Sequence, residues 1–350
     1  MLTEAVIIND ISDEKSQNTL NKAGQIIKNG GLVVFPTETV YGLGADATSA
    51  QAAEKIYNAK GRPSDNPLII HIHEPLAAEK YTYTTPLFYK IADAFMPGPI
   101  TVIMKAKEIV PKTVTAGLDT VAVRCPLHAV ARELIKKAGV PIAAPSANLS
   151  GSPSPTCFKY AYADMNGRVD MIIDGGECEV GLESTIVKIE ENGSLLLLRP
   201  GAITVEDLQT VCEDIKISDA VLSALKEGQA VLSPGMKYKH YAPKTPFFLL
   251  KGDFQKRLEY IASRKGRNAI ICYDEEEGDF KKIIPSELIF NFGKRYDMQE
   301  QARALFTLLR DADKTGADAI FAALPETSGI GMALYNIMIR AAGHRIVILN

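Results

Sequence analysis

The chain has 350 residues, 46% of them hydrophobic and 23% charged, which is the balance of an ordinary globular protein and enough length for two domains. Its formal net charge of −3 gives no bulk attraction for polyanions, so the composition disfavours a general nucleic-acid-binding protein, and any anion-binding surface has to be local. No apolar run approaches the roughly 18 residues of a membrane span, so the sequence predicts no transmembrane helix.

The cysteines are odd in number and scattered, without a CxxC pair: Cys125, Cys157, Cys178, Cys212 and Cys272. Such spacing favours reduced thiols in a cytoplasmic protein over a metal site or a disulfide framework. The start of the chain, MLTEAVIINDISDEK, is apolar and acidic and lacks the basic n-region of a signal peptide. We therefore expect a cytoplasmic protein.

In the first 200 residues, strand-like and helix-like segments alternate. Short apolar runs rich in Val and Ile predict strands at 5–9, 31–35, 67–72, 100–105, 120–124, 140–144, 169–173, 184–189 and 195–199. Helical periodicity predicts helices at about 14–28, 50–58 and 128–137. Because strands outnumber helices, this region predicts a mixed, twisted α/β sheet more than a strictly alternating parallel one.

A second region begins near residue 245, where apolar runs predict strands at 247–251, 268–272, 287–291, 318–324 and 345–349. Helical patterns at about 253–264, 298–313 and 331–342 separate several of them, which predicts a smaller, doubly wound, Rossmann-like parallel sheet. Between the regions, SPGMKYKHYAPKTP has the prolines of a linker but more ligand-capable side chains than a spacer needs. The predicted organisation is an amino-terminal domain at 1–212, a linker at 213–245 and a carboxy-terminal domain at 246–350.

The segment PTETVYGLGADA (36–47) follows a predicted strand, and strand exits are where α/β sheets commonly bind ligands. It concentrates hydroxyl and carboxylate groups: Thr37, Glu38, Thr39 and Tyr41. Its GLGADA part fits a G-x-G-x-x-[G/A] dinucleotide fingerprint only weakly, because polar residues precede it and the next helix starts only near residue 50. We interpret the segment as part of a site; the alternative is a glycine turn with a capping Asp46.

The loop KGRPSDNPLIIH (60–71) contains four side chains suited to binding: Lys60, Arg62, Asn66 and His71. Solvated surface charge is the usual explanation for a single Lys or Arg. Here two prolines stiffen the backbone, which lowers the entropic cost of holding several donors toward one anion. His71 and His73 share a strand face; buried, satisfied histidines are the alternative, and a metal pair is disfavoured because no third ligand is evident.

Other strand ends carry similar groups. Arg124 precedes Pro126 and suits a bidentate grip on a carboxylate or phosphate, with a peripheral ion pair as the alternative. APSANLSG offers Ser146 and Asn148 on a turn, and no adjacent histidine or G-x-S-x-G context predicts a serine nucleophile. ESTIV and LRPG add Ser184 and Arg199 at the ends of apolar strands.

The sequence contains no phosphate-binding GxxxxGK[ST] loop, zinc-protease, EF-hand or kinase signature. What recurs is a strand end bearing Thr, Ser, Asn or a cation, and the cations come from separate segments: Lys60, Arg62, Arg124 and Arg199. This pattern predicts a concave site for a small, highly anionic ligand set that also hydrogen-bonds a polar small molecule.

Six strings in this order and spacing, PTETVYGLG, KGRPSDNPLIIH, VRCP, APSANLSG, ESTIV and LRPG, resemble the YrdC-like threonylcarbamoyl-AMP synthase family from about residue 31 to 201. Six collinear motifs are far more specific than any one of them. The string SPGMKYKHYAP and the α/β region after it resemble the long form of the family. That resemblance implies a YrdC-like catalytic domain followed by a linker and a Rossmann-like domain.

Members of this family make L-threonylcarbamoyladenylate from L-threonine, bicarbonate and ATP and release pyrophosphate. The product is used for the N6-threonylcarbamoyladenosine modification at position 37 of ANN-decoding tRNAs. The resemblance therefore implies Mg²⁺ brought in with ATP and no metal site of the protein itself. It also implies a downstream tRNA threonylcarbamoyl transferase complex as partner, no stable nucleic-acid binding and no membrane.

Matching motif positions imply an L-threonine subsite at Thr39, His71, Arg124, Ser146 and Ser184. They imply ATP contacts at Lys60, Arg62, Asn66, Thr120, Asn148, Thr156, Arg199 and, from the linker, His240 or Tyr241. Lys60 and Arg62 are the implied catalytic residues, facing the phosphates and bicarbonate where the reactants meet.

Two other functions stay open at this point. An RNA-binding or ribosome-associated module is disfavoured by the net charge and by the lack of a basic stripe interleaved with aromatic residues. A carbamoyl-transfer domain of the hydrogenase-maturation type is disfavoured because such domains occur with zinc-finger and acylphosphatase-like regions, which this sequence lacks.

Overall fold

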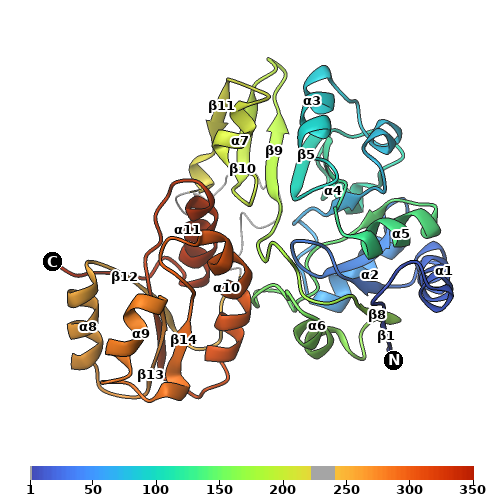
Figure 1. Ribbon diagram of the computed structural model, residues 1–350. Helices are drawn as coiled ribbons and strands as arrows, with labels where there is room; N and C mark the ends of the chain where they lie inside the picture. The colour runs from blue at the N-terminus through green and yellow to red at the C-terminus, as the bar shows by residue number, and fades with distance from the viewer. Residues whose placement is uncertain (1, 222–240) are drawn as a thin grey trace. The chain divides into compact units, whose positions relative to one another are not determined.

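The computed structural model describes residues 2–221 and 241–350. The chain divides into two compact α/β units, the first containing residues 1–150 and 154–237 and the second residues 151–153 and 238–350 (Figure 1). His240 therefore lies outside the described residues. No helix within the described ranges combines the length and apolar character needed to cross a bilayer.

The first unit is built on one sheet, which within the described residues has the strand order β1-β8-β2-β3-β7-β4-β6-β5-β9-β10-β11. The strands are β1 (Glu4–Ile7), β2 (Val33–Phe35), β3 (Gly42–Asp46), β4 (Ile69–His71), β5 (Ile100–Lys105), β6 (Thr120–Arg124), β7 (Ile142–Ala143), β8 (Met171–Asp174), β9 (Thr185–Ile189), β10 (Leu195–Arg199) and β11 (Ile215–Ile217). Strands β4 and β6 run parallel, whereas β5 and β6 run antiparallel. The predicted mixed sheet is confirmed.

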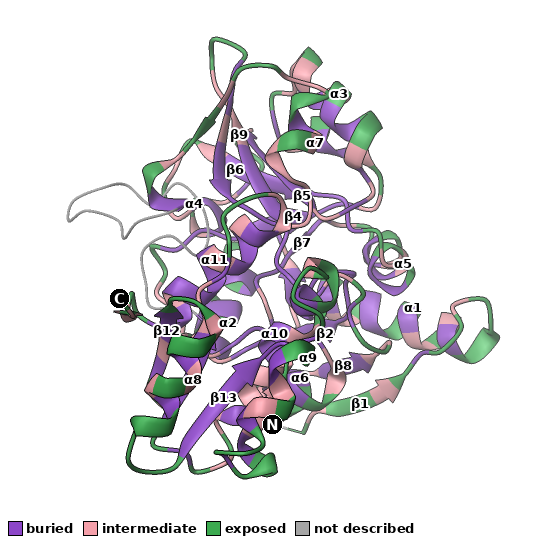
Figure 2. Ribbon diagram, turned by 60° about the vertical axis from the view of Figure 1, so that its left-hand side comes forward, coloured by how far each residue is buried: buried purple, intermediate pink, exposed green. Residues whose placement is uncertain are grey.

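The helices of this unit are α1 (Glu14–Lys28), α2 (Ala50–Lys60), α3 (Pro86–Phe95), α4 (Lys112–Thr115), α5 (Ala129–Ala138), α6 (Phe158–Met165) and α7 (Val205–Gln209), with short 3₁₀ turns η1 (Pro75–Lys80) and η2 (Asp219–Val221). Asp13 caps α1 by accepting from the Ser16 amide at 2.7 Å. Leu20 and Ile27 lie on one apolar face of α1 and pack with α5 in a core cluster. Figure 2 shows the central strands β4 to β7 as buried.

Strand β3 was not predicted, and the alternative of a glycine turn at GLGADA is wrong, as is the weak dinucleotide-fingerprint match; the interpretation of residues 36–47 as part of a site stays a prediction. Gly42–Asp46 pairs on both sides, with β2 and β7, so it is neither a dinucleotide-binding turn nor a glycine turn. A Cβ on Gly44 would approach Ile142 Cγ2 to 2.6 Å and Phe35 Cε1 to 2.7 Å, so these strands pack too closely for a side chain there. Asp46 accepts from the Thr48 amide at 2.8 Å, while Ser49 caps α2.

The predicted linker at 213–245 begins with residues that belong to the first unit's sheet. Strand β11 pairs in parallel with β10, and η2 follows it. Residues 222–240 of that segment lie outside the described residues, so the linker boundaries stay a prediction.

The second unit contains a five-stranded sheet in the order β14-β13-β15-β12-β16, within the described part of the chain. Its strands are β12 (Phe247–Lys251), β13 (Asn268–Cys272), β14 (Ile289–Asn291), β15 (Ala319–Ala323) and β16 (Ile346–Ile348), and its helices are α8 (Phe254–Ser263), α9 (Asp274–Phe280), α10 (Met298–Ala312) and α11 (Ile330–Ala341), with the turn η3 (Ser286–Leu288). All four strand pairings are parallel, so the predicted parallel sheet is confirmed.

The short helices α3, α4, α6, α7 and α9 were not predicted. Helices α4, α6, α7 and α9 have four to eight residues, too few for a 3.6-residue periodicity to stand out, whereas α3 has the apolar spacing of a helix and was overlooked. Helix α3 shows what was missed: Pro86 occupies its first turn, where no intrahelical N–H is required, and Thr85 caps it.

Two glycines inside helices have opposite packing, which makes a matched test. A Cβ on Gly24 of α1 would lie 2.8–3.0 Å from the backbone of Lys137 and Ala138 in α5, whereas a Cβ on Gly278 of α9 meets nothing within 4 Å. We expect Gly24→Ala to destabilise the first unit by about 1–3 kcal/mol through overpacking. Gly278→Ala should stabilise the second unit by about 0.5–1 kcal/mol, because alanine loses less backbone entropy in a helix. Chemical unfolding of each variant measures both, and equal effects would contradict the close α1–α5 contact.

Candidate active site

A row of residues crosses the neighbouring strands β4, β6, β5, β9 and β10: His71, Arg124, Thr101, Ile186 and Arg199. His71 pairs with Arg124, and one further step along the antiparallel β5–β6 pairing puts Thr101 opposite Arg124. Ile186 pairs with both Thr101 and Arg199. Since adjacent strands are about 4.8 Å apart, the register puts the backbones of Arg124 and Arg199 within roughly 14 Å of each other.

Arg199 occupies this row because β10 is irregular. Leu197 pairs with Val187 and Arg199 with Ile186, so the pairing register shifts between Leu197 and Arg199. If the antiparallel pairing were regular, Arg199 would instead pair with Thr185 of β9. A bulge re-aims side chains in this way, and bulges are common beside active sites.

The row borders an apolar cluster that includes residues of the same strands: Ile69, Ile103, Ala122, Ile186 and Leu198. Ile69 and Ala122 lie two residues before His71 and Arg124, and side chains two apart on a strand share a face. The polar groups are therefore set against a dry surface, where electrostatic interactions are stronger than in water.

Glu38, in the hairpin between β2 and β3, pairs with Arg124. Arg124 Nη2 donates to Glu38 Oε1 at 2.6 Å, and Glu38 Oε2 accepts from the amides of Leu127 and His128 at 3.0 and 3.4 Å. Arg124 is only 4% exposed and Glu38 only 2%. Because an unpaired buried charge is very costly, Glu38 both permits the burial of Arg124 and fixes its guanidinium plane.

Thr39 follows Glu38 in the same hairpin and is fully buried. Its hydroxyl lies 2.9 Å from that of Thr37, and Thr37 in turn donates to the Val40 carbonyl at 2.6 Å. These bonds close the turn on itself, so the predicted threonine-binding Thr39 is held beside the Glu38–Arg124 ion pair.

Lys60, the last residue of α2, is buried with its ammonium group among carbonyl oxygens. Its Nζ donates to the Ser146 carbonyl and, at 2.6 Å, to the Asn148 carbonyl. Ser146 Oγ donates to Asn148 Oδ1 at 2.6 Å. The Ala147 amide between them donates to the Tyr41 carbonyl at 2.7 Å. The 36–41 hairpin therefore contacts both the loop that holds Lys60 and the strand end that bears Arg124.

Arg62 lies on the loop that leaves α2 through Gly61, whose φ of +63° ends the helix in the left-handed region. Its Nε donates to the Asn66 carbonyl at 3.3 Å and its Nη2 to the Pro67 carbonyl at 3.0 Å. Arg62 thus braces its own loop and sits beside Asn66, which is 1% exposed. The prediction that this loop is stiff is supported by these contacts.

Arg199 is the centre of a second charged cluster. Its Nη1 donates to Glu183 Oε2 at 2.7 Å, its Nε to the Ser184 carbonyl at 2.9 Å and its Nη2 to Ser184 Oγ at 3.0 Å. Ser184 Oγ also lies 2.7 Å from Thr101 Oγ1. Ser184 and Arg199, predicted for different subsites, therefore touch directly.

Within the described residues, four buried side-chain atoms have no hydrogen-bond partner, and three belong to this region: Asn66 Oδ1, His71 Nδ1 and Arg124 Nε. Buried polar atoms are normally satisfied, so each exception calls for an explanation. Unmade bonds to an acceptor (Asn66), a donor (Arg124) and an imidazole nitrogen are what a polar, charged ligand would complete. The fourth such atom, in the second unit, is considered below.

His71 is buried against Phe35, whose ring meets it edge-on at 6.3 Å between centroids. Burial, and then the charge of Arg124, lower the pKa of His71 to about 3. The imidazole is therefore neutral at physiological pH and can accept a hydrogen bond at Nδ1.

The remaining predicted residues are less closely connected to the row. Thr120 lies at the other end of β6 from Arg124, opposite Lys105. Thr156 is buried, and its carbonyl accepts from the Cys178 amide at 2.9 Å. Tyr241 is in the second unit, where its backbone has a φ of +63° and its ring lies 5.4 Å from that of Phe306. Their predicted roles stay predictions.

Three residues that hold the predicted side chains had no predicted role: Glu38, Glu183 and Thr101. Each one holds a predicted residue: Glu38 holds Arg124, while Glu183 and Thr101 hold Arg199 and Ser184. The sequence hints at the two glutamates, because each stands beside a motif threonine or serine (TET, EST). It contains no comparable signal for Thr101. Which arginine each acid meets depends on strand order.

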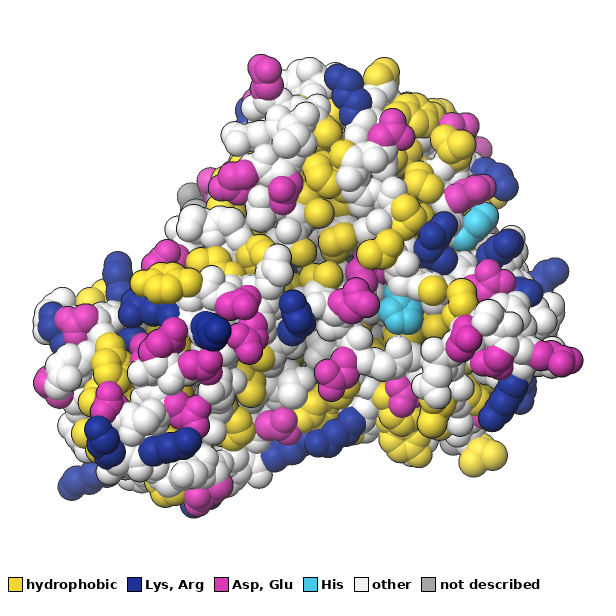
Figure 3. Space-filling view, in the orientation of Figure 1, with side chains coloured by type: hydrophobic (Ala, Val, Ile, Leu, Met, Phe, Trp, Pro, Cys, Tyr) yellow, Lys and Arg dark blue, Asp and Glu magenta, His cyan; other side chains and the backbone are white. Residues whose placement is uncertain are grey.

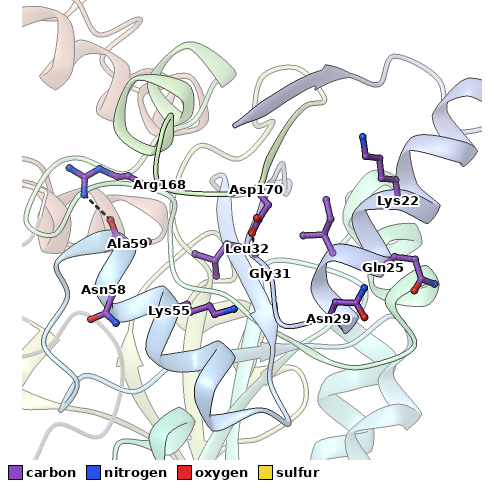
Figure 4. A pocket seen from close by; sticks show the side chains of 11 residues that line it. Lys22, Gln25, Asn29, Gly31, Leu32, Lys55, Asn58, Ala59, Arg168 and Asp170 are labelled. Carbon is purple, nitrogen blue, oxygen red and sulfur yellow. Dashed lines mark hydrogen bonds between the residues drawn. The ribbon is translucent and has the colours of Figure 1, made fainter. Parts of the chain in front are cut away.

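The surroundings restrict the kinds of ligand. Among the described residues, no three His, Cys, Asp or Glu side chains are grouped to hold a metal ion. On the face drawn in Figure 3, Lys and Arg alternate with Asp and Glu and form no continuous basic field. A groove of about 640 Å³ in the first unit, with Lys55, Arg168 and Asp170 at its wall, contains none of the predicted site residues (Figure 4).

Comparisons with known proteins assign both parts of the chain. The Sua5_yciO_yrdC family model, described as "Telomere recombination", matches residues 25–201, and the model for the "Threonylcarbamoyl-AMP synthase, C-terminal domain" matches residues 203–343. A Pyrococcus abyssi protein named threonylcarbamoyl-AMP synthase is 40% identical over 97% of this chain and 99% of its own length. A Bacillus subtilis protein of the same name is 38% identical over 97% of both.

The fold agrees with these sequence relationships. The crystal structure of P. abyssi Sua5 complexed with L-threonine matches with a TM-score of 0.88 and 38% identity, covering all of both chains. The family resemblance inferred from six short motifs is thereby confirmed over the full length. This chain belongs to the Sua5/YciO/YrdC family, in its long form with the threonylcarbamoyl-AMP synthase carboxy-terminal domain.

Proposed function

We propose that this protein makes L-threonylcarbamoyladenylate from L-threonine, bicarbonate and ATP and releases pyrophosphate. The observation that carries the proposal is the buried Arg124, held by Glu38 beside His71, with Arg124 Nε and His71 Nδ1 both lacking partners. The relatives named threonylcarbamoyl-AMP synthase, and the one bound to L-threonine, indicate which substrate chemistry this arrangement serves.

Charge is the main obstacle that such a site has to overcome. ATP carries roughly four negative charges and bicarbonate and the threonine carboxylate about one each, so the reactants repel one another. Lys60, Arg62, Arg124 and Arg199 offset this repulsion from cations that are already positioned. Such preorganised charges need little rearrangement as the transition state forms.

For L-threonine, Arg124 is the carboxylate clamp: its guanidinium is oriented by Glu38 and retains Nε for a second acceptor. Neutral His71 accepts from the substrate amine or hydroxyl. Thr39, Ser146 and Ser184 supply the remaining polar contacts around the substrate.

For ATP, we assign Lys60 and Arg62 to the phosphates and the reacting carbonate, and Asn66, Asn148 and Arg199 to neighbouring contacts. Thr120, Thr156 and either His240 or Tyr241 complete the set by family position. Mg²⁺ fits as a metal carried by the nucleotide, since the carboxylates near the site, Glu38 and Glu183, are paired with arginines. When bound, it would neutralise phosphate charge.

The chemistry needs no covalent enzyme intermediate. The neutral threonine amine attacks the bicarbonate carbon, and loss of water leaves a carbamate. A carbamate oxygen then attacks the α-phosphorus of ATP. The bond from the α-phosphorus to the oxygen that bridges the α- and β-phosphates breaks, and pyrophosphate leaves with its electron pair. This chain contributes position and charge, which can supply most of the rate in phosphoryl transfer.

The product is a mixed anhydride that water can hydrolyse, so its consumer has to be an acceptor enzyme acting soon after release. We assign that role to the tRNA threonylcarbamoyl transferase complex, which forms N6-threonylcarbamoyladenosine at position 37 of ANN-decoding tRNAs. Such a partner also implies a cytoplasmic protein.

The activity itself gives the direct test. With ATP, Mg²⁺ and bicarbonate present, adding L-threonine should start pyrophosphate release, and mass spectrometry should detect threonylcarbamoyladenylate. D-threonine and L-valine serve as controls, since the clamp and hydroxyl contacts select both stereochemistry and the side-chain oxygen. Threonine-independent release, or none, would end the proposal.

Two arginine variants should separate binding from chemistry. Arg62→Ala should lower kcat by at least about tenfold with the fold intact, the scale of one lost charge-stabilising contact. Arg124→Lys should instead raise the KM for L-threonine by about tenfold, because lysine cannot grip a carboxylate with a planar fork. The exposed Lys136→Ala is the control for loss of charge. Wild-type kinetics in either arginine variant would remove that residue from the site.

The pH dependence of His71 is a separate expectation. Between about pH 5 and 7.5 its imidazole should keep neutral ¹⁵N chemical shifts, because its pKa is lowered to about 3. The folded-state pKa lies below the unfolded value of about 6.5, so the unfolded chain binds the proton first. The free energy of unfolding should therefore fall as pH drops through the window between these values. His71→Asn should reduce this slope, and the remainder comes from His128 and His344, whose pKa values burial also lowers. A His71 titration near pH 6.5 would contradict the buried neutral state.

A further inference from the structure

The parallel sheet of the second unit has a topological switch point. Strand β15 leads to α11, whereas its neighbours β12 and β13 lead to α8 and α9. Helix α8 packs with α9 and α10 packs with α11, so the two pairs cover opposite faces (Figure 1). Chains that leave adjacent strands toward opposite faces open a crevice at the carboxyl edge of the sheet, where α/β proteins bind ligands.

A cavity of about 250 Å³ lies at that edge. Residues at the carboxyl ends of the three strands line it: Leu250 and Lys251 end β12 and Gly252 follows it, Tyr273 follows β13, and Leu324, Pro325 and Glu326 follow β15. Arg257 of α8, Gly331 of α11 and Arg295 before α10 complete the polar part of the wall. Among the described residues, three cations (Lys251, Arg257 and Arg295) line the wall with one carboxylate, Glu326, and Glu276 outside the lining pairs with Arg257.

Arg257 is buried in this wall at 2% exposure. Its Nη1 and Nη2 donate to the two carboxylate oxygens of Glu276, at 3.0 and 2.5 Å. Its Nε has no acceptor among the described residues. It is the fourth of the buried side-chain atoms in the described ranges that lack a hydrogen-bond partner. The other three lie in the candidate active site. The same kind of vacancy, a glutamate-oriented arginine with one unused donor, therefore occurs in both units.

Helix α11 starts at the cavity with a turn suited to an anion. Gly329 has a φ of +52°, and no side chain caps the helix. A Cβ on Gly331 would come within 2.7 Å of the Glu326 carbonyl, so only glycine lets the strand exit and the helix start approach this closely. The first-turn amides of a helix have no acceptor four residues back, and the helix dipole favours negative charge there. In α11 the Met332 amide donates to the Gly329 carbonyl at 3.2 Å, so the anion would meet the amides that precede it.

The loop that carries Arg295 is held in place by two neighbouring elements. Gln301, 3% exposed, donates to the carbonyls of Lys294 and Arg295 at 2.8 and 3.0 Å, and Glu275 accepts from the Arg295 amide at 3.2 Å. The guanidinium of Arg295 itself is exposed at the rim of the cavity. Because the backbone is already fixed, only the side chain of Arg295 has to be ordered when it meets an anion.

We propose that this cavity binds a small phosphate-bearing anion, with the phosphate between the α11 amino terminus, Arg257 Nε and the side chain of Arg295. Its volume is below the roughly 300–1,000 Å³ of pockets for drug-sized ligands, so inorganic phosphate or pyrophosphate fits and a dinucleotide does not. This assignment is independent of the reaction proposed for the first unit and gives the carboxy-terminal unit a binding role of its own.

The chain contains no tryptophan, so a single introduced one reports on its own surroundings. Tyr296, 82% exposed at the cavity rim, is the position for it. In Tyr296→Trp protein of full length, pyrophosphate and phosphate should each give a saturable fluorescence change, and sodium acetate at equal ionic strength should not. Pyrophosphate could also bind at the candidate active site in the first unit. A fluorescence change that depends on Arg295 identifies binding in this cavity.

Arg295→Ala in this background should weaken the apparent affinity by at least about tenfold, the effect of losing one charge-assisted hydrogen bond. Arg264→Ala, which removes another exposed arginine of the same unit that does not line the cavity, should leave the apparent affinity unchanged. Threonine-dependent pyrophosphate release should persist in both variants. Failure of the proposed enzymatic function can therefore be distinguished from failure of the proposed anion site. Two outcomes would show that the proposal is wrong. In the first, the fluorescence change is absent or follows ionic strength alone, and the amide NMR signals of Gly252 and Gly331 do not shift. In the second, Arg295→Ala and Arg264→Ala change the apparent affinity equally.

Discussion

A buried guanidinium needs a counter-charge, and in the first unit Arg124 obtains it from Glu38. This contact joins the end of β6 to the hairpin at 36–41, which also holds the loop of Ser146 and Asn148 through the Tyr41 carbonyl. Lys60 in turn is fixed by that loop. Removing one partner of such a pair leaves an uncompensated buried charge, which costs about 3–5 kcal/mol. The position of the threonine-clamping arginine and the order of the surrounding loops are thus parts of one arrangement.

The two cations of the segment 60–62 donate to backbone carbonyls, whereas Arg124 and Arg199 of the candidate site are paired with glutamates. Lys60 meets the carbonyls of Ser146 and Asn148, and Arg62 meets those of Asn66 and Pro67. Carbonyl dipoles restrict a cation without cancelling its charge. The ammonium and guanidinium groups therefore stay positive and oriented before any substrate arrives, which is the condition for electrostatic stabilisation at low reorganisation cost.

Both units use a buried arginine that is paired with a glutamate while its Nε has no acceptor among the described residues: Arg124 donates to Glu38 through Nη2 alone, and Arg257 donates to Glu276 through both Nη1 and Nη2. In each case the arginine lies beside strand ends. Burial of such a pair contributes little net stability compared with apolar packing. We interpret each pair as a means of orienting an arginine donor toward a ligand. The same interpretation applies to the candidate active site of the first unit and to the proposed anion site of the second.

The two sheets, most strands and the motif residues could be predicted from the amino-acid sequence, because apolar runs, prolines and charged strand ends are local signals. It also identified the family, since six strings in a fixed order are rarely matched by chance. It could not reveal β3, whose glycines look like a turn until β2 and β7 close around them, nor the acids that hold Arg124 and Arg199. Those partners depend on which strands become neighbours and on the register shift in β10, and long-range pairing is decided only when the whole sheet buries its apolar faces together.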